Sequence, residues 1–517
     1  MLGALNKMSS LVRGWAWNNE IRYRPTNAAD AVAVVDELQL LLNGGRLDPS
    51  YRSFIIDRYT AKRTQSGSNT AALRDALELF LFTSEFHATN LARPRSVPRR
   101  RYPPTPSQNR PYKAVVYIFL DGGADTYNMI VPHSGCSGTL DYSHYAAVRG
   151  NNALPQGSVL QISVPSSDGQ PCSTFGVHPS LPTLKATYDD GDASFIANVG
   201  ALVEPIDIEG MYAGKPRPPS LFAHNMQRTV AQNVHAQKAA TAKGVLGRML
   251  AALEVEQPSG EPPYAAKSYS ISGNNKAIEG SRGAPEIMTA GGPARLSRYA
   301  DLQADISELA SNEAESIFAD TFSRTLEAAV EGAEDLKRKL DADEAQPSTP
   351  FGSGTVARQL KAVANVIGAR ESIGNEREVF FVKYMGWDSH FGLDNDVTPK
   401  FATVEEGLSS FVAEMKTQGI WDNVTVVLSS EFGRTLGSNG QGTDHGWGGN
   451  SFVMGGSVKG GHILGKYPPS LTTGPHIFRR TVIPTTSWEA VFNAAASWFG
   501  VEDSPLDSAI PHRPDLA

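Results

Sequence analysis

Residues 426–449 read VVLSSEFGRTLGSNGQGTDHGWGG and join an apolar segment to a glycine-rich loop. The apolar run from Val424 to Leu428 is short and rich in β-branched residues, which predicts a buried strand. Glu431, Asp444 and His445 follow it in the loop. In α/β proteins, ligand and metal sites lie where hydrophobic strands end in loops of this kind. We therefore expect this stretch to form part of a site.

Four segments of continuous apolar character predict buried strands. They are residues 113–120, 193–199, 378–385 and 423–429. An amphipathic pattern between the last two predicts a helix over residues 404–417. Strands that are separated by helical segments indicate an α/β fold with a mainly parallel sheet.

Potential metal ligands follow three of these strands. The residues concerned are Asp121 (with Asp125 and Asn128 close behind), Asp388 and His390, and Glu431, to which the glycine-rich loop adds Asp444 and His445. Because the carboxyl ends of parallel strands share one edge of the sheet, these groups can converge although they are far apart in sequence. Carboxylates with imidazoles suit Zn²⁺, Mn²⁺, Mg²⁺ or Ca²⁺, and histidine favours the transition metals. Any single carboxylate could instead cap a helix.

Two further residues have two interpretations each. Arg434 follows Glu431 by three residues and could clamp an anionic substrate or pair with Glu431. His224 follows the second predicted strand and could reach the same edge or be structural. The loop glycines at 440, 442, 446, 448 and 449 permit positive φ and close approach to a ligand, or satisfy tight turns.

The chain divides into three parts by pattern. Residues 1–92 read as helical, with Val32, Val35, Leu38 and Leu41 at helical spacing. Residues 93–112 are rich in proline and arginine, which predicts a linker. Residues 113–511 form the α/β domain, with an acidic, alanine-rich helical insertion near 300–370 whose charges we expect to be solvated.

The composition of the chain favours a globular protein and argues against some functions. The chain has 517 residues, 40% of them hydrophobic and 20% charged, as in ordinary globular proteins. The formal net charge of −7 argues against general nucleic-acid binding. No run approaches the roughly 18 apolar residues of a transmembrane helix, and the N-terminus does not read as a secretory signal. Cys136 and Cys172 could pair in an oxidising compartment or remain buried thiols.

Seven segments together carry a family resemblance. In chain order they are IFLDGGADTYNMIVP, FGVHPSLPTL, LFAHNMQ, GWDSHF, SSEFGRT, GTDHGWGG and SWEAVFNAAASWFG, spread over residues 113–511. With them the chain resembles the sulfatase-like domain-of-unknown-function family 1501, within the alkaline phosphatase superfamily. The SEFGRT and GTDHG pair is the most specific. The first 90 residues resemble the C-terminal end of the helical family 1800, so the chain could be a fusion or a fragment of a longer product.

The resemblance implies a doubly wound α/β sheet with metal ligands at strand ends. It implies that Asp121 is the first metal aspartate and that Asp388 and His390 are an Asp-x-His-type ligand pair. Glu431 stands where an Asp-His pair usually follows a strand, and His445 is similar to the last histidine of the superfamily.

The nucleophile departs from the family pattern, because the usual Ser-His is Ala223-His224 here. Ser220 and Thr126 are possible substitutes. The resemblance implies a metal-dependent hydrolase of sulfate or phosphate esters, which could act on an anionic polysaccharide and would be exported. The competing hypothesis is a non-catalytic binding or structural protein that keeps the fold and lacks the nucleophile.

Overall fold

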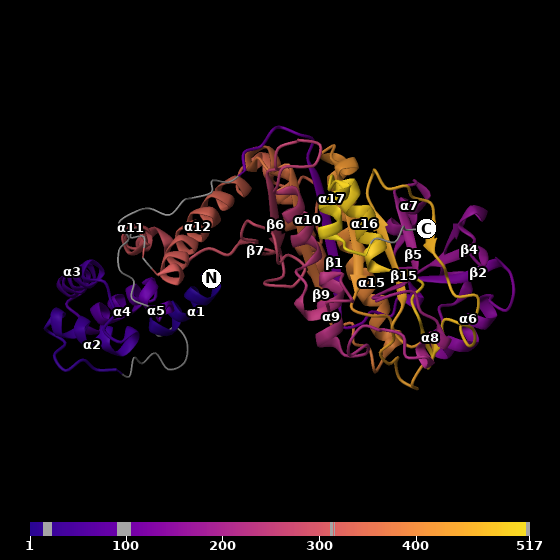
Figure 1. Ribbon diagram of the computed structural model, residues 1–517, viewed down its shortest axis with the longest axis horizontal. Helices are drawn as coiled ribbons and strands as arrows, with labels where there is room; N and C mark the ends of the chain where they lie inside the picture. Colours follow the sequence, from indigo (N-terminus) through magenta and orange to yellow (C-terminus); the bar gives the residue numbers. More distant parts are fainter. Residues whose placement is uncertain (14–22, 90–104, 311–313, 315, 513–517) are drawn as a thin grey trace. The chain divides into compact units, whose positions relative to one another are not determined.

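A computed structural model describes residues 1–13, 23–89, 105–310, 314 and 316–512 (Figure 1). Contacts divide the chain into two compact units. One comprises Met1–Pro103 with Pro293–Arg338, and the other comprises Pro104–Gly292 with Lys339–Ala517. The five arginines of the predicted linker, at 93, 95, 99, 100 and 101, lie outside the described residues.

The smaller unit is helical. Its helices are α1 (Leu2–Val12), α2 (Ala31–Asn43), α3 (Pro49–Ser66), α4 (Asn69–Phe80), α5 (Ser84–His87), α11 (Tyr299–Ala310) and most of α12 (Ile317–Leu340). Leu302, Ile306 and Leu326 share one hydrophobic core with Val35 and Leu79. The insertion that the sequence assigned to the α/β domain thus packs, over residues 293–338, with the N-terminal helices, because its apolar face completes their core.

The buried face of α2 differs from the predicted one. Asp30 caps the helix by accepting hydrogen bonds from the N–H groups of Val32 and Ala33. Val34, Val35 and Leu38 are buried, whereas Val32 and Leu41 are 47% and 65% exposed. Apolar residues cover more than one face of this helix, so helical spacing alone does not determine which of them are buried.

A ten-stranded sheet forms the centre of the larger unit, in the order β12-β5-β11-β10-β1-β9-β6-β7-β8, with β15 beside β5. The strands are β1 (Lys113–Asp121), β5 (Ala193–Gly200), β6 (Ala266–Ser270), β7 (Glu286–Thr289), β8 (Gly292–Pro293), β9 (Arg377–Met385), β10 (Val424–Ser430), β11 (Gly449–Met454), β12 (Ile463–Gly465) and β15 (Thr486–Ser487). β11 is antiparallel to β10 and β5, while β1, β9, β10 and β6 pair in parallel. The four predicted strands and the mainly parallel sheet are confirmed.

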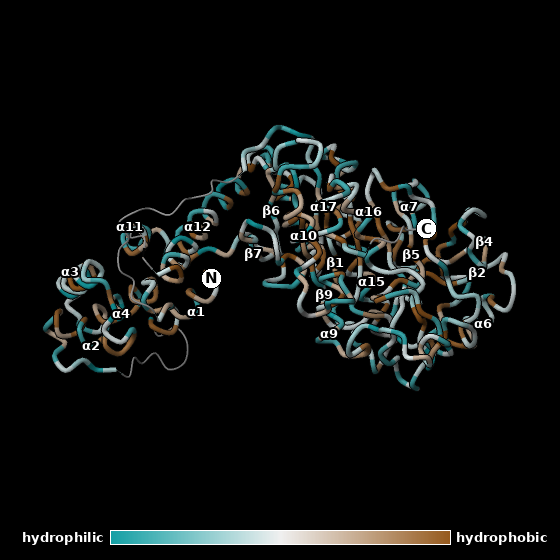
Figure 2. Tube along the Cα trace, viewed as in Figure 1, coloured by the Kyte–Doolittle hydropathy of each residue, from teal (hydrophilic) through white to brown (hydrophobic). Residues whose placement is uncertain are grey.

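Helices cover both faces of this sheet. On one face Val115, Tyr117 and Phe119 of β1 pack with α10 (Val245–Leu253), α16 (Trp488–Phe499) and α17 (Asp503–Ala509). The intervening residues of β1 point to the opposite face by the alternation of a strand. Outside that first cluster, α7 (Pro182–Asp189) contacts β5 and α13 (Thr355–Gly368) contacts β9, with α15 (Leu393–Thr417) packed on α13. Figure 2 shows hydrophobic residues concentrated along β1 and the helices beside it. The doubly wound arrangement is confirmed.

A small antiparallel sheet of β2 (Ile130–Cys136), β3 (Leu160–Ser163) and β4 (Cys172–Val177) completes this unit with short helices and strands. These are α6 (Tyr142–Arg149), α8 (Ile208–Tyr212), α9 (His224–Asn233), α14 (Arg370–Ile373), β13 (Ile477–Phe478) and β14 (Thr481–Val482). Cys136 and Cys172 form a disulfide between β2 and β4.

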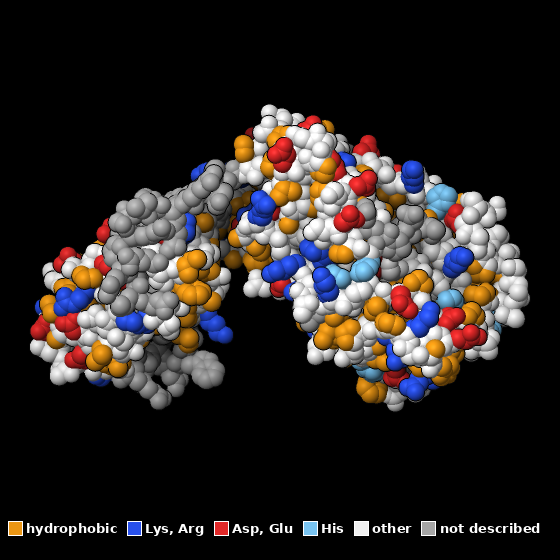
Figure 3. All heavy atoms as spheres, in the orientation of Figure 1, with side chains coloured by type: hydrophobic (Ala, Val, Ile, Leu, Met, Phe, Trp, Pro, Cys, Tyr) orange, Lys and Arg blue, Asp and Glu red, His pale blue; other side chains and the backbone are white. Residues whose placement is uncertain are grey.

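The surface of the larger unit mixes both signs of charge, as Figure 3 shows for its visible face. The chain carries 47 basic and 54 acidic residues, so this mixture reflects the whole sequence. Among the described helices, none is both long and apolar enough to span a bilayer.

A buried carboxyl group at the start of β9 makes stability depend on pH. Both Tyr112 and Tyr269 donate hydrogen bonds to Glu378, at 2.6 and 3.0 Å. Burial raises the pKa of Glu378 to about 7 from its ordinary 4.5. The folded protein therefore keeps the proton where the unfolded chain has lost it, so stability falls as pH rises from 4.5 through 7.

We compare the unfolding free energy of the Glu378→Gln variant with that of the native chain. From pH 4.5 to pH 8 we expect the difference between them to shift by about 3 kcal/mol in favour of the variant. The substituted amide stays neutral at both pH values, while the native carboxyl must ionise in an apolar site. Urea unfolding of both proteins at the two pH values measures the difference. A gap that is equal at both pH values would contradict the prediction.

Candidate metal centre

The register of the central strands places their carboxyl ends at one edge of the sheet. Leu120 of β1 pairs with Ser430 of β10, and Asp121 pairs with Met385 of β9. Asp388 and Glu431 therefore leave the sheet beside Asp121. The residues after β5 lead into α9, which begins at His224. Segments that are widely separated in sequence thus meet where the strand pattern predicted.

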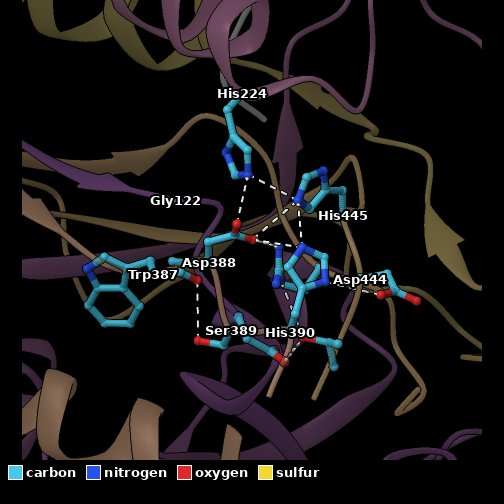
Figure 4. A network of polar contacts seen from close by, with 12 residues as sticks. Gly122, His224, Trp387, Asp388, Ser389, His390, Asp444 and His445 are labelled. Carbon is cyan, nitrogen blue, oxygen red and sulfur yellow. Dashed lines mark hydrogen bonds and ion pairs between the residues drawn. The ribbon is translucent and has the colours of Figure 1, made fainter. Parts of the chain in front are cut away.

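Four side chains form a compact group at this edge, which we call the His/Asp cluster: His224, Asp388, His390 and His445 (Figure 4). The Nε2 atom of His445 lies 3.0 Å from Nε2 of His224 and 3.0 Å from Nε2 of His390. It also lies 3.2 Å from Oδ1 of Asp388. Ligand atoms of His224, Asp388 and His445 all lie within 4.8 Å of one another. The cluster is partly open to solvent, since these side chains are 22–43% exposed.

The other ring nitrogen of each histidine faces an acceptor. Nδ1 of His224 lies 2.8 Å from Oε1 of Glu431, and Nδ1 of His445 lies 2.7 Å from the carbonyl oxygen of Phe222. Nδ1 of His390 lies 3.3 Å from Oδ1 of Asp444. Carboxylate and carbonyl oxygens only accept, so each Nδ1 is the donor in its contact and the Nε2 atom of each ring points into the cluster.

Charge at the cluster is set by these contacts. The hydrogen bond to Glu431 raises the pKa of His224, whereas burial lowers the pKa of His445. Burial would raise the pKa of Asp388, but the hydrogen bond from Arg434 and its positive charge outweigh this effect and lower it. Asp388 is therefore an anion among imidazoles, a donor set suited to a divalent cation.

Arg434 forms an ion pair with Asp388. Its side chain is fully buried and its Nη1 donates to Oδ1 of Asp388 at 2.9 Å. Its Nη2 atom is buried and has no hydrogen-bond partner in the described part of the chain. Of the two interpretations of Arg434, the structure shows an ion pair, but with Asp388 and not with Glu431.

Glu431 is held by the backbone of the β1 loop. The N–H of Gly122 donates to both carboxylate oxygens of Glu431, at 2.9 and 3.1 Å. Burial would raise the pKa of Glu431, yet the bonds from His224 and Gly122 outweigh it and lower the pKa. Gly122 is required here because a Cβ atom would lie 2.5 Å from the backbone nitrogen of Asp388. Glu431 thus contacts the outer nitrogen of His224 and not the centre of the cluster.

Asp121 lies beside the cluster and faces two cations that the sequence analysis missed. Nε of Arg228, one turn after His224 on α9, is 2.5 Å from Oδ1 of Asp121. Nζ of Lys383 is 3.5 Å from its Oδ2. The signal for Arg228 was its spacing of four residues from His224, which puts both on one face of the helix.

The remaining candidates lie away from the cluster. Asp125 pairs with Arg149 at 2.7 Å, and both are fully buried. The amide of Asn128 donates to the carbonyl of Asn152. Thr126 is 3% exposed and its hydroxyl accepts from the N–H of Asn450 at 2.7 Å. Ser220 precedes α9 and has a φ of +50°. No described contact joins Thr126 or Ser220 to the cluster.

The loop glycines serve mostly close packing. Of the five glycines named above, Gly440 alone has a positive φ among the described residues, at +104°. A Cβ atom on Gly446 would lie 2.6 Å from the backbone of Arg434, and one on Gly448 would lie 2.4 Å from Oδ1 of Asn198. Arg434 and His445 form a β-bridge across the loop. The expected positive φ is therefore wrong for most of these positions, because backbone contact requires glycine there.

Several solved structures are similar to this chain at low sequence identity. The lipoteichoic acid synthase LtaP from Listeria monocytogenes matches at 11% identity, 77% coverage of this chain, 76% of that chain and a TM-score of 0.29. The zinc complex of the C-terminal periplasmic domain of EcEptC from Escherichia coli matches at 10% identity, with 81% of this chain and 92% of that chain covered and a TM-score of 0.33. The phosphonate monoester hydrolase SpPMH from Silicibacter pomeroyi matches at 10% identity, with 75% of this chain and 74% of that chain covered and a TM-score of 0.32.

Comparison of the sequence with family models assigns the chain to a family. No curated protein sequence matches this chain. The family model described as "Protein of unknown function (DUF1501)" matches residues 112–482, a range that includes β1, β9, β10 and the whole His/Asp cluster. The chain is therefore a member of the DUF1501 family.

Proposed function

We propose that this protein is a divalent-metal-dependent hydrolase of phosphate or sulfate esters, with the metal held by the His/Asp cluster. The observation that carries the proposal is the convergence of three Nε2 atoms on Asp388 while each Nδ1 faces an acceptor. Without a cation or an added proton, lone pairs 3.0 Å apart repel each other. Metal-ligating histidines characteristically have their other nitrogen fixed in this way.

The donor set favours zinc or manganese, because imidazole ligands select transition metals over Mg²⁺ and Ca²⁺. In this proposal His224, Asp388, His390 and His445 hold the metal. Glu431 and Asp444, which the sequence offered as ligands, orient His224 and His390 through their Nδ1 atoms. Asp121 instead balances Arg228 and Lys383.

When bound, a divalent metal would polarise an ester oxygen and lower the pKa of a water molecule in its coordination sphere. The chain supplies the anion-binding groups. Arg434, which is fully buried, holds the carboxylate of Asp388 in place through its Nη1 atom. Arg228 and Lys383 add positive charge next to Asp121, with side chains 39% and 26% exposed. An anionic ester, carried by a polysaccharide or another extracellular polymer, matches this charge.

The attacking group in this proposal is water, because residue 223 is alanine and no described contact joins Thr126 or Ser220 to the cluster. Glu431 keeps the Nδ1 proton of His224 in place. The chain's own contribution is thus to bind and orient the ester and to fix the tautomers of the histidines.

Metal analysis combined with hydrolysis of aryl phosphates and aryl sulfates tests the proposal. We expect about one equivalent of a transition metal in purified protein, and turnover of one ester class that a chelator abolishes and the metal restores. A protein that neither retains nor takes up a divalent metal would refute the metal site.

The alternative is a binding protein that keeps the metal and does not turn over esters. Ala223 at the family's serine position favours it. The two functions separate in the same experiment: metal without hydrolysis of either ester class, with measurable binding of phosphate or sulfate, supports the alternative.

We also propose that the protein is exported. The Cys136–Cys172 disulfide supports this location, because disulfides persist in oxidising compartments and are rare in the cytosol.

The contact between Glu431 and His224 predicts a partial loss of metal affinity when Glu431 is replaced. We expect Glu431→Gln to weaken metal affinity tenfold to about a hundredfold without loss of the fold, because an amide holds the Nδ1 proton of His224 less strongly. Competition with a chelating dye measures the affinity. Glu414→Gln on α15 is the control, since Glu414 is equally buried and bonds to Thr349. Equal affinities in the two variants would exclude an orienting role for Glu431.

A further inference from the structure

A cavity of about 680 Å³ lies at the carboxyl end of β5, outside the His/Asp cluster. The segment after β5, the segment after β12 and the first turn of α16 surround it. Figure 1 shows β15 beside β5 and leading directly into α16. Its size is in the range of small-molecule sites in proteins.

Two buried polar atoms on its lining have no hydrogen-bond partner within the described chain. They are Oε1 of Glu489 and Nδ1 of His476. Glu489 is 2% exposed, so its oxygen is withdrawn from bulk water as well as from protein donors. Most buried polar atoms in folded proteins are satisfied, so two unsatisfied ones on the lining of one cavity leave bonds that a ligand can supply.

Charged residues of both signs line the cavity, since Glu204 and Lys466 lie on it besides Glu489. No ion pair joins Glu489 to a cation in the part of the chain that the structure describes. The nearby guanidinium of Arg248 is instead bonded to the carbonyl oxygens of Ala509 and Val234, at 2.8 and 3.4 Å. Burial raises the pKa of Glu489 to about 7 and lowers the pKa of His476. Near neutral pH both the protonated and the ionised form of Glu489 are therefore populated, and each can form a hydrogen bond with a hydroxyl group.

Apolar residues also line the cavity. Leu202, Ile206 and Ala490 are 6%, 5% and 2% exposed and belong to its lining. Gln237, also on the lining, already donates to the carbonyl of Val203 at 2.9 Å. Apolar side chains together with a carboxyl and an imidazole suit a ring with C–H groups on its faces and hydroxyl groups on its edge.

We propose that this cavity binds an uncharged sugar ring, with hydroxyl groups bonded to Oε1 of Glu489 and Nδ1 of His476 and one ring face against Leu202 and Ile206. The proposal stands on the cavity alone and does not require ester hydrolysis. A hydroxyl group both donates and accepts, so it satisfies a carboxyl in either protonation state and a neutral imidazole.

Two apolar residues of the cavity's lining pack against a residue of the loop that carries the cluster. Nε1 of Trp447 donates to the carbonyl of Ala201 at 2.8 Å, and its ring packs in one core with Leu202 and Ile206. Trp447 is two residues after His445. Packing of Trp447 on Leu202 and Ile206 thus connects the lining of the cavity to the segment that presents His445.

Saturation-transfer NMR on the full chain tests the proposal with glucose, galactose and mannose methyl glycosides, and with glucosamine and butylammonium as cationic probes. We expect transfer to the ring protons of at least one neutral glycoside. Glu489→Ala should weaken that binding about tenfold or more, because it removes a hydrogen-bonding group from the site. Glu489→Gln should retain most of it.

Glu378→Gln is the matched control, because Glu378 is also buried and its pKa is likewise raised to about 7, but its oxygens are bonded to tyrosines away from the cavity. This variant should bind as the native chain does. Binding confined to the amines would overturn the proposal in favour of a cation site. No transfer to any glycoside, or equal loss in the Glu489→Ala and Glu378→Gln variants, would also overturn it.

Discussion

Asp388→Asn is expected to lower metal affinity more than roughly a hundredfold and to abolish metal-dependent ester hydrolysis. Asp388 is the one carboxylate in the described part of the chain that contacts all three histidines of the cluster, at 3.1–3.3 Å. Asparagine retains an oxygen for the hydrogen bond from Arg434 but removes the negative charge. The fold should therefore persist while the cation loses its anionic ligand. Elemental analysis of the purified variant and its aryl ester hydrolysis measure the two effects.

Asp444→Asn is the control for this variant. Asp444 is also at the cluster, but its Oδ1 contacts Nδ1 of His390 and the amide of Asn439. Its loss should weaken metal binding far less. If Asp388→Asn retains the native metal content, Asp388 is not a ligand and the proposed site is wrong.

Arg149→Met is expected to cost about 3–5 kcal/mol of unfolding free energy, the largest stability effect that we foresee for one side chain. Asp125 and Arg149 are both fully buried and lie 2.7 Å apart. Methionine fills the space but leaves the carboxylate of Asp125 without its cation. Arg149 also donates to the carbonyl of Leu436 at 3.0 Å, so the glycine-rich loop loses a support. Urea unfolding followed by tryptophan fluorescence measures the loss.

A double variant separates the buried charge from the packing. Combining Arg149→Met with Asp125→Leu removes both charges, and we expect it to recover much of the lost stability. A single variant within about 1 kcal/mol of the native chain would show that the pair contributes no net stability.

The fold was predictable where continuous apolar runs mark buried strands. β1, β5, β9 and β10 begin and end within one or two residues of the predicted segments. β11 was missed, because Phe452 and Val453 lie in a short run between glycines and their pairing with β10 and β5 depends on tertiary contacts. The placement of residues 293–338 with the N-terminal helices also depends on long-range packing that no local pattern encodes.

The convergence of the candidate site residues was predictable to the level of the sheet edge. Strand ends indicated that Asp388, Glu431 and His445 would lie close together, since parallel strands end on one side. Which atom of each group faces inward depends on side-chain direction. Glu431 contacts an outer nitrogen, and Asp121 faces Arg228 and Lys383, because backbone donors and helix α9 approach from directions that sequence spacing does not specify.

The antiparallel pairing of β10 with β11 has a practical consequence for the loop between them. The chain leaves the sheet at Ser430 and re-enters it at Gly449, so the excursion begins and ends in adjacent strands. Its tip at residues 439–441 is exposed, whereas Arg434 and Thr443 are buried. Asn439 at this tip nevertheless donates to Oδ1 of Asp444 at 3.1 Å and to the carbonyl oxygen of His390 at 3.3 Å. Added residues or an affinity label at the tip would therefore disturb the cluster, so a point of attachment for immobilising the protein has to lie elsewhere.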